Sequence, residues 1–178
     1  MEAATAPVEE TAAPAAPRNR MISAVLALVG AVIAGYMFLY SVGAVTSLAC
    51  GAGGECETVQ ASPWAAFYGV PVPLIGLIGY ALILAASLAG VQPAFVGDRR
   101  IAAALLGLST IAFIFSIYLS AVEAFLIEAW CRWCIASAVV STLLFLASLP
   151  ELRRLRSARP RAGPFEAVRR LDAGSTGG

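Results

Sequence analysis

The chain has 178 residues, of which 60% are hydrophobic and only 13% are charged. Soluble domains are about 45–50% apolar and about 25% charged, so one small core cannot hide this much apolar surface. The composition therefore excludes an ordinary soluble enzyme, and a net charge of +1 gives no support for nucleic-acid binding. The chain has no histidine, which excludes His-based triads and His-ligated metals and leaves four cysteines as the main reactive side chains.

Residues 1–20 are rich in Ala, Pro and Glu and are expected to form a flexible cytoplasmic tail rather than a signal peptide. Four apolar segments follow, each long enough to cross a bilayer as a helix. They cover about Met21–Val45, Pro71–Val91, Ile101–Ile127 and Trp130–Leu149. The sequence thus predicts a four-span membrane domain over residues 21–149, and an Arg-rich cytoplasmic tail over residues 150–178.

The arginines predict how the spans are oriented. Eleven of the twelve precede span one, lie between spans two and three, or follow span four, and only Arg132 lies in the opposite set of loops. Those opposite loops carry Glu55, Glu57 and Glu128. Because positive residues stay on the cytoplasmic side, we expect an all-α, integral membrane four-helix bundle with both termini inside the cell.

All four cysteines fall on the extracytoplasmic side of this topology. Cys50 and Cys56 lie in the first outer loop, and Cys131 and Cys134 lie at the outer start of the last span. In a bacterium this side of the membrane is the oxidising compartment. Their placement indicates thiol chemistry.

Cys131-Arg132-Trp133-Cys134 forms a C-x-x-C motif at the start of a helix. Residues three apart share a helix face, and the positive end of the helix stabilises a thiolate, which is the attacking species. Arg132 either lowers the thiol pKa further or anchors the chain at the membrane interface. The motif favours redox chemistry, while a structural disulfide and half of a zinc site are the alternatives.

Cys50 and Cys56 are separated by five residues, three of which are glycine. Glycine gives the backbone the freedom that a moving loop needs. A disulfide between them closes a small loop and gains little entropy, so it suits exchange better, although a plain loop disulfide is the alternative. A four-cysteine zinc site is disfavoured because its pairs are usually two to four residues apart.

The segment Ser62–Gly69 joins this loop to span two and is expected to form a short interfacial helix over the outer end of the bundle. Ser62 is a suitable N-cap, and Trp64, Phe67 and Tyr68 suit the membrane interface.

Span three carries candidate site residues near its outer half. Phe115 and Leu119 either pack in the bundle or flank a planar cofactor beside Cys134. Glu123 lies near the outer end of the same span. An ionisable group at that depth is either functional or reaches outwards to the interface.

Together these features resemble the bacterial branch of the vitamin K epoxide reductase family over about residues 21–149. The resemblance rests on Cys50 and Cys56, on Ser62 six residues later, and on the C-x-x-C. It rests also on the Gly-Val-Pro segment that leads into Leu74-Ile75-Gly76 and Gly79-Tyr80. It implies a four-helix bundle with a quinone at its outer end. It further implies that Cys134 faces the quinone, that Cys131 receives electrons from Cys56, and that Cys50 exchanges with a thioredoxin-fold protein. Ser62 would then lie near the quinone or hold the loop.

Two departures from the family pattern narrow this expectation. Animal members place Asn in span two and Tyr in span four near the quinone, where this chain has Val72 and Ala138. The difference favours a membrane quinone, ubiquinone or menaquinone, over vitamin K epoxide, with Ala138 at a quinone contact. The segment after span four is also too short for a fused thioredoxin-like domain, which implies a separate DsbA-like partner.

The sequence therefore predicts a thiol–disulfide oxidoreductase of a bacterial cytoplasmic membrane, with its site facing the periplasm or cell exterior. Electrons would pass from the partner through both cysteine pairs to the quinone pool. One alternative is a DsbB-type oxidase, although such enzymes carry the C-x-x-C in the first outer loop. Another is a four-span scaffold with structural disulfides. A transporter is disfavoured because the spans lack buried polar pairs and broken helices.

Overall fold

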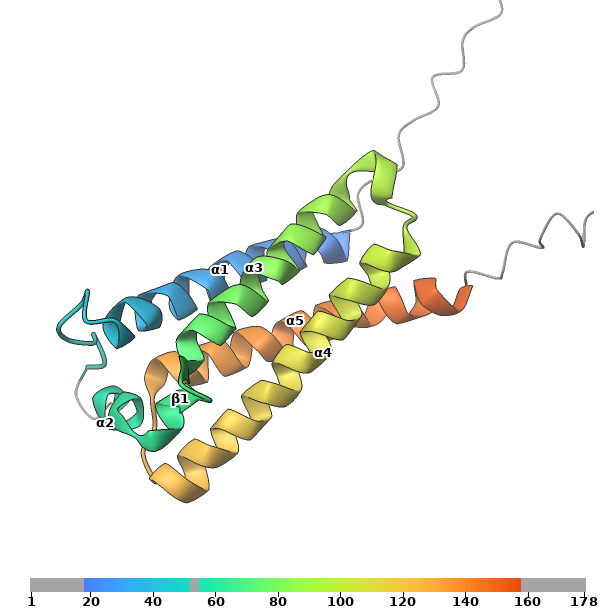
Figure 1. Ribbon diagram of the computed structural model, residues 1–178. Coiled ribbons are helices and arrows are strands. Elements are labelled where there is room, and N and C mark those ends of the chain that lie inside the picture. Colours follow the sequence, from blue (N-terminus) through green and yellow to red (C-terminus); the bar gives the residue numbers. More distant parts are fainter. Residues whose placement is uncertain (1–17, 52–54, 158–178) are drawn as a thin grey trace, which may run out of the picture.

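The fold is a bundle of four long helices, seen in a computed structural model that describes residues 18–51 and 55–157 (Figure 1). All four helices are long and apolar enough to cross a membrane. Helix α1 packs against α3 and α5, and α4 packs against the same two helices. The long helices are α1 (Arg18–Ser41), α3 (Val72–Val91), α4 (Arg99–Val122) and α5 (Arg132–Ser157). The predicted all-α membrane bundle is confirmed.

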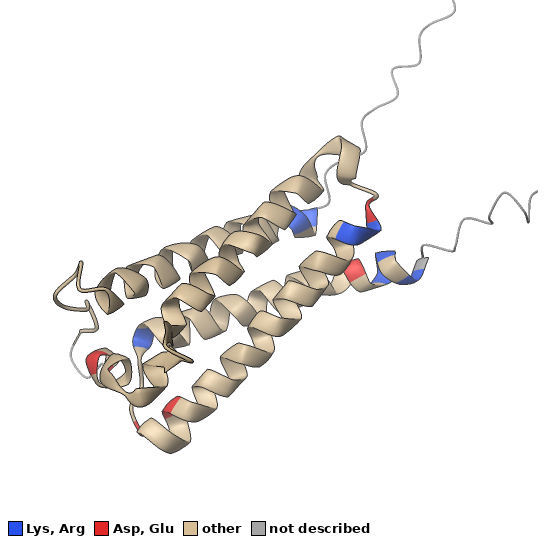
Figure 2. Cartoon of the chain, in the orientation of Figure 1, with Lys and Arg blue, Asp and Glu red and all other residues tan. Residues whose placement is uncertain are grey.

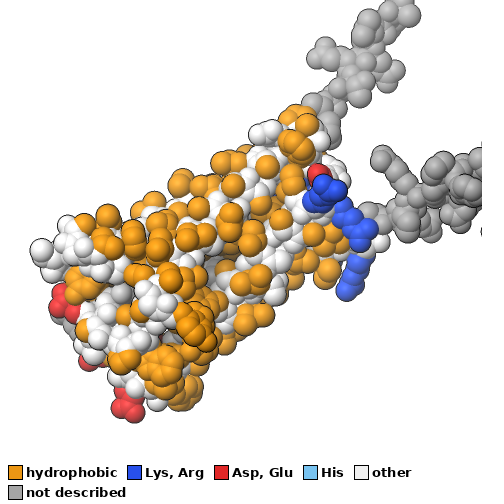
Figure 3. All heavy atoms as spheres, in the orientation of Figure 1, with side chains coloured by type: hydrophobic (Ala, Val, Ile, Leu, Met, Phe, Trp, Pro, Cys, Tyr) orange, Lys and Arg blue, Asp and Glu red, His pale blue; other side chains and the backbone are white. Residues whose placement is uncertain are grey.

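The surface of the bundle is apolar along its length, as Figure 3 shows for one face. Large side chains such as Val32 on α1 and Ile111 on α4 point outwards. The buried face of α1 carries small residues instead, among them Ala27, Gly30 and Ala34. Since lipid is as apolar as leucine, helices in a membrane associate mainly by close packing, and small residues permit it.

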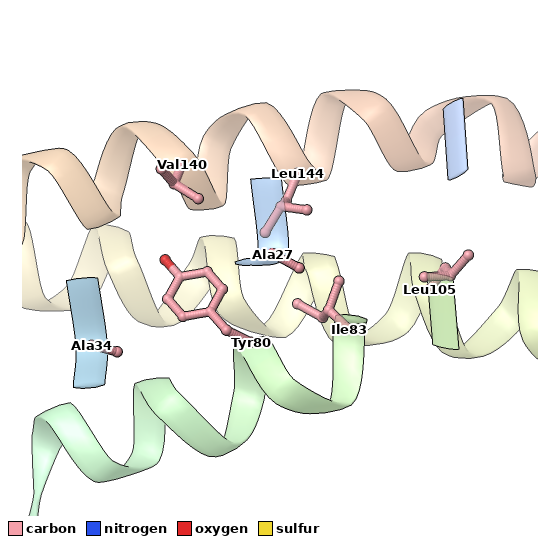
Figure 4. Close-up of a cluster of buried hydrophobic side chains, with 7 residues drawn as sticks. All are labelled: Ala27, Ala34, Tyr80, Ile83, Leu105, Val140 and Leu144. Carbon is pink, nitrogen blue, oxygen red and sulfur yellow. The ribbon is translucent and has the colours of Figure 1, made fainter. Parts of the chain in front are cut away.

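The core of the bundle centres on Tyr80 of α3 (Figure 4). A Cβ atom at Gly30 would overlap the Tyr80 ring, so this glycine lets α1 and α3 approach closely. The Tyr80 hydroxyl donates to the carbonyl oxygen of Ser137 at 3.0 Å and lies 2.8 Å from its side-chain oxygen. Ile83, Leu105 and Leu144 complete the packed layer towards the chain termini.

Several helix ends differ from the predicted spans. Helix α1 ends at Ser41, because Gly43 adopts a left-handed backbone with φ of +76° that closes the helix. Asp98 caps the start of α4 by accepting the Arg100 N–H at 2.7 Å, and a short turn, η2 (Pro93–Phe95), precedes it. Helix α5 continues past Pro150 to Ser157. Most of both predicted tails lies outside the described residues.

The outer end, where the cysteines lie, has a small cap. It consists of α2 (Cys56–Ala61), a 3-10 turn η1 (Pro63–Ala65) and a two-stranded antiparallel hairpin, β1 (Ala66–Phe67) and β2 (Val70–Pro71). The predicted short interfacial helix over residues 62–69 is reduced to the 3-10 turn η1, and the rest of that segment belongs to the hairpin. Ser62 ends α2 with an extended backbone, and Pro63 has no N–H with which to continue it.

The inner end is where the described chain begins and ends, and most of the basic residues lie there (Figure 2). Arg20 and Glu151 form a buried ion pair of 2.9 Å that joins α1 to α5. The Arg20 guanidinium also donates to the carbonyl oxygen of Gly90 at 2.8 Å, at the end of α3. These contacts join α1, α3 and α5 at the inner end, and both buried charges have a partner.

Candidate active site

Three of the four cysteines lie in one buried cluster at the outer end. Cys50 and Cys56 form a disulfide with a Cα–Cα distance of 6.2 Å, while Cys131 and Cys134 are thiols. Cys56 and Cys131 are both 0% exposed and pack in the same cluster, together with Met37 of α1. Cys134 packs against this cluster from α5. The fold therefore places the loop disulfide beside the outer thiol of the C-x-x-C.

Cys131 caps the start of α5 with its sulfur atom. The backbone N–H of Cys134 donates to the Cys131 Sγ at 3.3 Å, and the Ile135 N–H donates to the Cys131 carbonyl oxygen at 2.9 Å. A serine or aspartate oxygen usually accepts this side-chain bond at a helix start. The sulfur thus lies at the positive end of the helix dipole, which favours its ionised form.

The Cys131 thiol precedes the membrane-spanning part of α5, and its pKa is lowered from the ordinary value. The main cause is the hydrogen bond from the Cys134 thiol, and the backbone N–H of Cys134 adds to it. Burial and the negative charge of Glu123 act in the opposite direction. Arg132 instead lies against the loop, where a Cβ at Gly51 would come 3.0 Å from its Nη1 atom.

The cap is joined to the C-x-x-C segment through the backbone. The Glu55 N–H, at the start of α2, donates to the carbonyl oxygen of Trp130 at 3.3 Å. Tyr36 of α1 reaches the same region, because its hydroxyl accepts the Ala49 N–H at 2.9 Å and its ring lies 5.0 Å from the Trp133 ring. These contacts hold both cysteine pairs at one level of the bundle.

A cavity of about 290 Å³, here called the outer cavity, lies directly below Cys134. It is mostly apolar and is lined by all four long helices and by Gln60 of α2. Tyr80 forms part of its lining and also belongs to the packed core, so the cavity extends to the top of the core layer. The Cys134 side chain therefore borders a cavity whose surface is largely apolar.

The predicted quinone contacts divide into two groups. Cys134, Phe115 and Leu119 line the outer cavity. Ser62 lies elsewhere: its hydroxyl donates to the Val59 carbonyl oxygen at 2.7 Å, and it borders a more open hollow beside the cap. Ala138 is not among the lining residues, although its neighbour Ser137 is. The roles of these residues in quinone binding remain predictions.

Glu123 points into the bundle rather than towards the interface. It begins a π-helical turn, η3 (Glu123–Ile127), that follows α4, and it is 5% exposed. One carboxylate oxygen accepts the Cys131 N–H at 3.2 Å, and the side chain lines the outer cavity. The interpretation that Glu123 extends outwards to the interface is therefore wrong.

Sequence reasoning did not single out Tyr80 or Trp133 as site residues, yet both line the outer cavity. Trp133 lies inside the C-x-x-C, and its indole N–H is buried without an acceptor among the described residues. Its position between two cysteines was the available signal. Tyr80 belonged to the segments that carry the family resemblance, but it was given no site role, because a single tyrosine in an apolar span is equally suited to packing.

The vitamin K epoxide reductase family model matches residues 21–149, which is most of the chain. The chain belongs to this family. It is accordingly a multi-pass membrane protein and a thiol–disulfide oxidoreductase that works with a redox partner. Members of the family use a quinone, so the outer cavity can be tested for its fit to one.

The residues of the outer cavity fit a quinone head group. Its volume is close to the lower end of ordinary ligand pockets, about 300 Å³, and its walls are largely apolar with a few polar groups. Buried N–H groups are normally paired, and the free indole N–H of Trp133 is a donor of the kind that a quinone carbonyl oxygen accepts. Phe115 and Leu119 supply apolar surface for the ring.

Proposed function

We propose that this protein reoxidises an extracytoplasmic DsbA-like protein and passes the two electrons to ubiquinone or menaquinone, supporting disulfide bond formation. One observation carries the proposal: the buried cluster joins the loop disulfide to Cys131, while Cys134 of the same motif lines the apolar outer cavity. The two pairs thus form a continuous route from the loop to the cavity.

The first step is exchange with the partner at Cys50. Cys50 is 7% exposed whereas Cys56 is 0% exposed, so the partner thiolate attacks Cys50 and Cys56 leaves as a thiolate. The partner's second thiolate then attacks the mixed disulfide. This releases the partner with an internal disulfide and leaves Cys50 and Cys56 reduced. Oxidation of the partner and reduction of the loop pair therefore balance at two electrons.

The second step passes the same electrons inwards. The Cys56 thiolate attacks Cys131 of an oxidised Cys131–Cys134 pair, and the Cys134 sulfur leaves. Cys50 then attacks Cys56, which restores the loop disulfide and frees Cys131. After this step the loop pair is a disulfide again and the C-x-x-C pair is reduced.

The third step takes place in the outer cavity. A quinone bound there supplies the capacity to accept two electrons and two protons. Trp133 donates its indole N–H, Phe115 and Leu119 exclude water, and Cys134 presents its sulfur. The Cys131 thiolate then forms an S–S bond with Cys134, and the sulfur pair gives up two electrons to the acceptor in the cavity. Apolar walls protect the exchange from water.

The site faces the periplasm or cell exterior of a bacterial cytoplasmic membrane under this proposal. Its support is the separation of charges: basic residues gather at the inner end, opposite the cysteines (Figure 2). The residues 21–149 form the working membrane domain, and the segments 1–20 and 150–178 lie in the cytoplasm.

Alanine substitutions separate the roles of the two cysteine pairs. Cys50→Ala and Cys56→Ala should abolish oxidation of a reduced DsbA-like protein, yet leave part of the quinone reduction by a small dithiol, which reaches the C-x-x-C directly. Cys131→Ala and Cys134→Ala should stop both reactions. Quinone absorbance and the partner's thiol content are the measurements. Full partner oxidation by the Cys50 and Cys56 variants would contradict the relay.

A further inference from the structure

The carboxyl group of Glu123 lies beside the C-x-x-C motif. One oxygen accepts the Cys131 backbone N–H at 3.2 Å, and the side chains of Glu123 and Cys134 line the same outer cavity. Glu123 is 5% exposed, and it is the one acidic or basic side chain among the described residues that line the outer cavity. It therefore places a carboxyl group in the same largely apolar cavity as the reacting Cys134 side chain.

Glu123 has no cationic partner in the described part of the chain, where both ion pairs involve Glu151. The titratable groups near it are the two thiols of the motif, and Tyr80 of α3 lines the same cavity. Helix α1 contributes only apolar residues to the lining. Burying a carboxyl group without a cation is unfavourable, and such groups are concentrated where chemistry needs them.

We propose that Glu123 is a catalytic residue that takes the proton of the Cys134 thiol and delivers it into the outer cavity during quinone reduction. This inference rests on the proposed function and adds a proton route to its electron route. The position of the Glu123 carboxyl group carries it, because that group is buried, accepts the Cys131 N–H and lines the outer cavity together with Cys134. A thiol must lose its proton before its sulfur can donate electrons efficiently.

The step balances in protons and electrons. The S–H bond of Cys134 breaks and its proton moves to the Glu123 carboxylate, while the Cys131 thiolate forms an S–S bond with Cys134. Two electrons leave the sulfur pair and reduce the quinone to the quinol. One of the two protons that the quinol needs comes from Glu123, and water supplies the other, matching the proton that Cys131 releases on ionising. Glu123 ends as the carboxylate again.

Glu123→Gln tests this role, because the amide oxygen can still accept the Cys131 N–H but cannot relay a proton. Glu128→Gln is the matched control, since Glu128 is exposed five residues further along. Pre-reduced full-length protein is mixed with a short-chain ubiquinone in a single turnover. Alkylation of Cys134 in quinone-free protein is followed separately by peptide mass spectrometry, and quinone affinity is measured by equilibrium binding.

In Glu123→Gln we expect quinone reduction to fall at least ~100-fold, the scale of a lost acid–base group. Cys134 alkylation should stay equal or rise, because a negative charge beside the thiol has been removed. Quinone affinity should be unchanged, Glu123→Asp should recover part of the rate, and Glu128→Gln should match the wild type.

Two results would overturn the proton role. One is a wild-type rate of quinone reduction in Glu123→Gln. The other is a parallel loss of alkylation and quinone reduction that Glu123→Asp does not relieve, which would make Glu123 a structural support for the start of α5. Failure of the proposed function itself looks different: the wild-type protein and Glu128→Gln would then alkylate normally and leave the quinone oxidised.

Discussion

Two glutamates are buried at opposite ends of the bundle, and their surroundings differ. At the inner end, both carboxylate oxygens of Glu151 accept hydrogen bonds from Arg20, and Asn19 donates a further one. At the outer end, Glu123 accepts the Cys131 backbone N–H and shares the outer cavity with Cys134, with no cation paired to it in the described chain. The same residue type is neutralised in one place and left unpaired in the other.

The contrast separates structural from chemical use of a buried charge. The Arg20–Glu151 pair connects α1 with α5 and also reaches the end of α3, so it fixes three helices at the membrane boundary. Glu123 connects only the end of α4 with the start of α5. A charge that serves stability is fully paired, whereas a charge that exchanges protons must remain accessible to its partner group.

The largest expected effect is at the inner end. Glu151→Gln leaves the buried Arg20 without a counter-charge and should lower the free energy of unfolding by about 3–5 kcal/mol. Unfolding in detergent micelles, followed by circular dichroism, measures it. Replacing both residues, Arg20→Met with Glu151→Met, should recover most of the loss. If the single variant is as stable as the wild type, the pair does not hold the inner end.

Between the two ends, Tyr80 packs against Gly30 and belongs both to the core and to the lining of the outer cavity. The added methyl group of Gly30→Ala would overlap the Tyr80 ring. The ring or the helices must then move apart, which should lower the free energy of unfolding by about 1–3 kcal/mol. Gly107→Ala on α4 is the control, because nothing lies within 4 Å of its added Cβ. Equal stability of the two variants would show that the layer tolerates displacement.

The smallest expected effect is at the outer end. Glu123→Gln removes a buried charge that has no cationic partner, so the free energy of unfolding should change by less than ~1 kcal/mol or increase. The same unfolding assay compares it directly with Glu151→Gln. A loss as large as that of Glu151→Gln would remove the distinction between the two carboxyl groups and make Glu123 a structural residue.

The sequence was sufficient for the bundle and for the grouping of the cysteines. The length of the apolar segments predicts the number of spans. The side of the membrane on which each cysteine lies follows from the loop or helix end that carries it. The inward face of each span was not readable in the same way, because lipid and core are both apolar and select the same side chains. For this reason Tyr80 was not singled out, and the predicted contact at Ala138 lies one residue from Ser137, which lines the outer cavity.

Short elements at the outer end were also beyond sequence reasoning. Helix α2 spans only Cys56–Ala61, too few residues for a periodic pattern. The aromatic residues that follow it suggested a longer helix, but only the 3-10 turn η1 forms there before the chain enters the hairpin. The inward turn of Glu123 depends on the π-helical turn that ends α4. Such a turn rotates the last residues relative to a regular helix. Nothing in the types of its residues predicts a π-helical turn.

The Cys131 sulfur accepts a backbone hydrogen bond in the first turn of α5. The strength of that hydrogen bond therefore depends on the redox state of Cys131. A negatively charged sulfur accepts the Cys134 N–H more strongly than a sulfur already bonded to another sulfur. The first turn is therefore tightest when the thiolate is ready to react and looser once a disulfide has formed. The geometry at the start of α5, which forms one wall of the outer cavity, therefore depends on the redox state of Cys131.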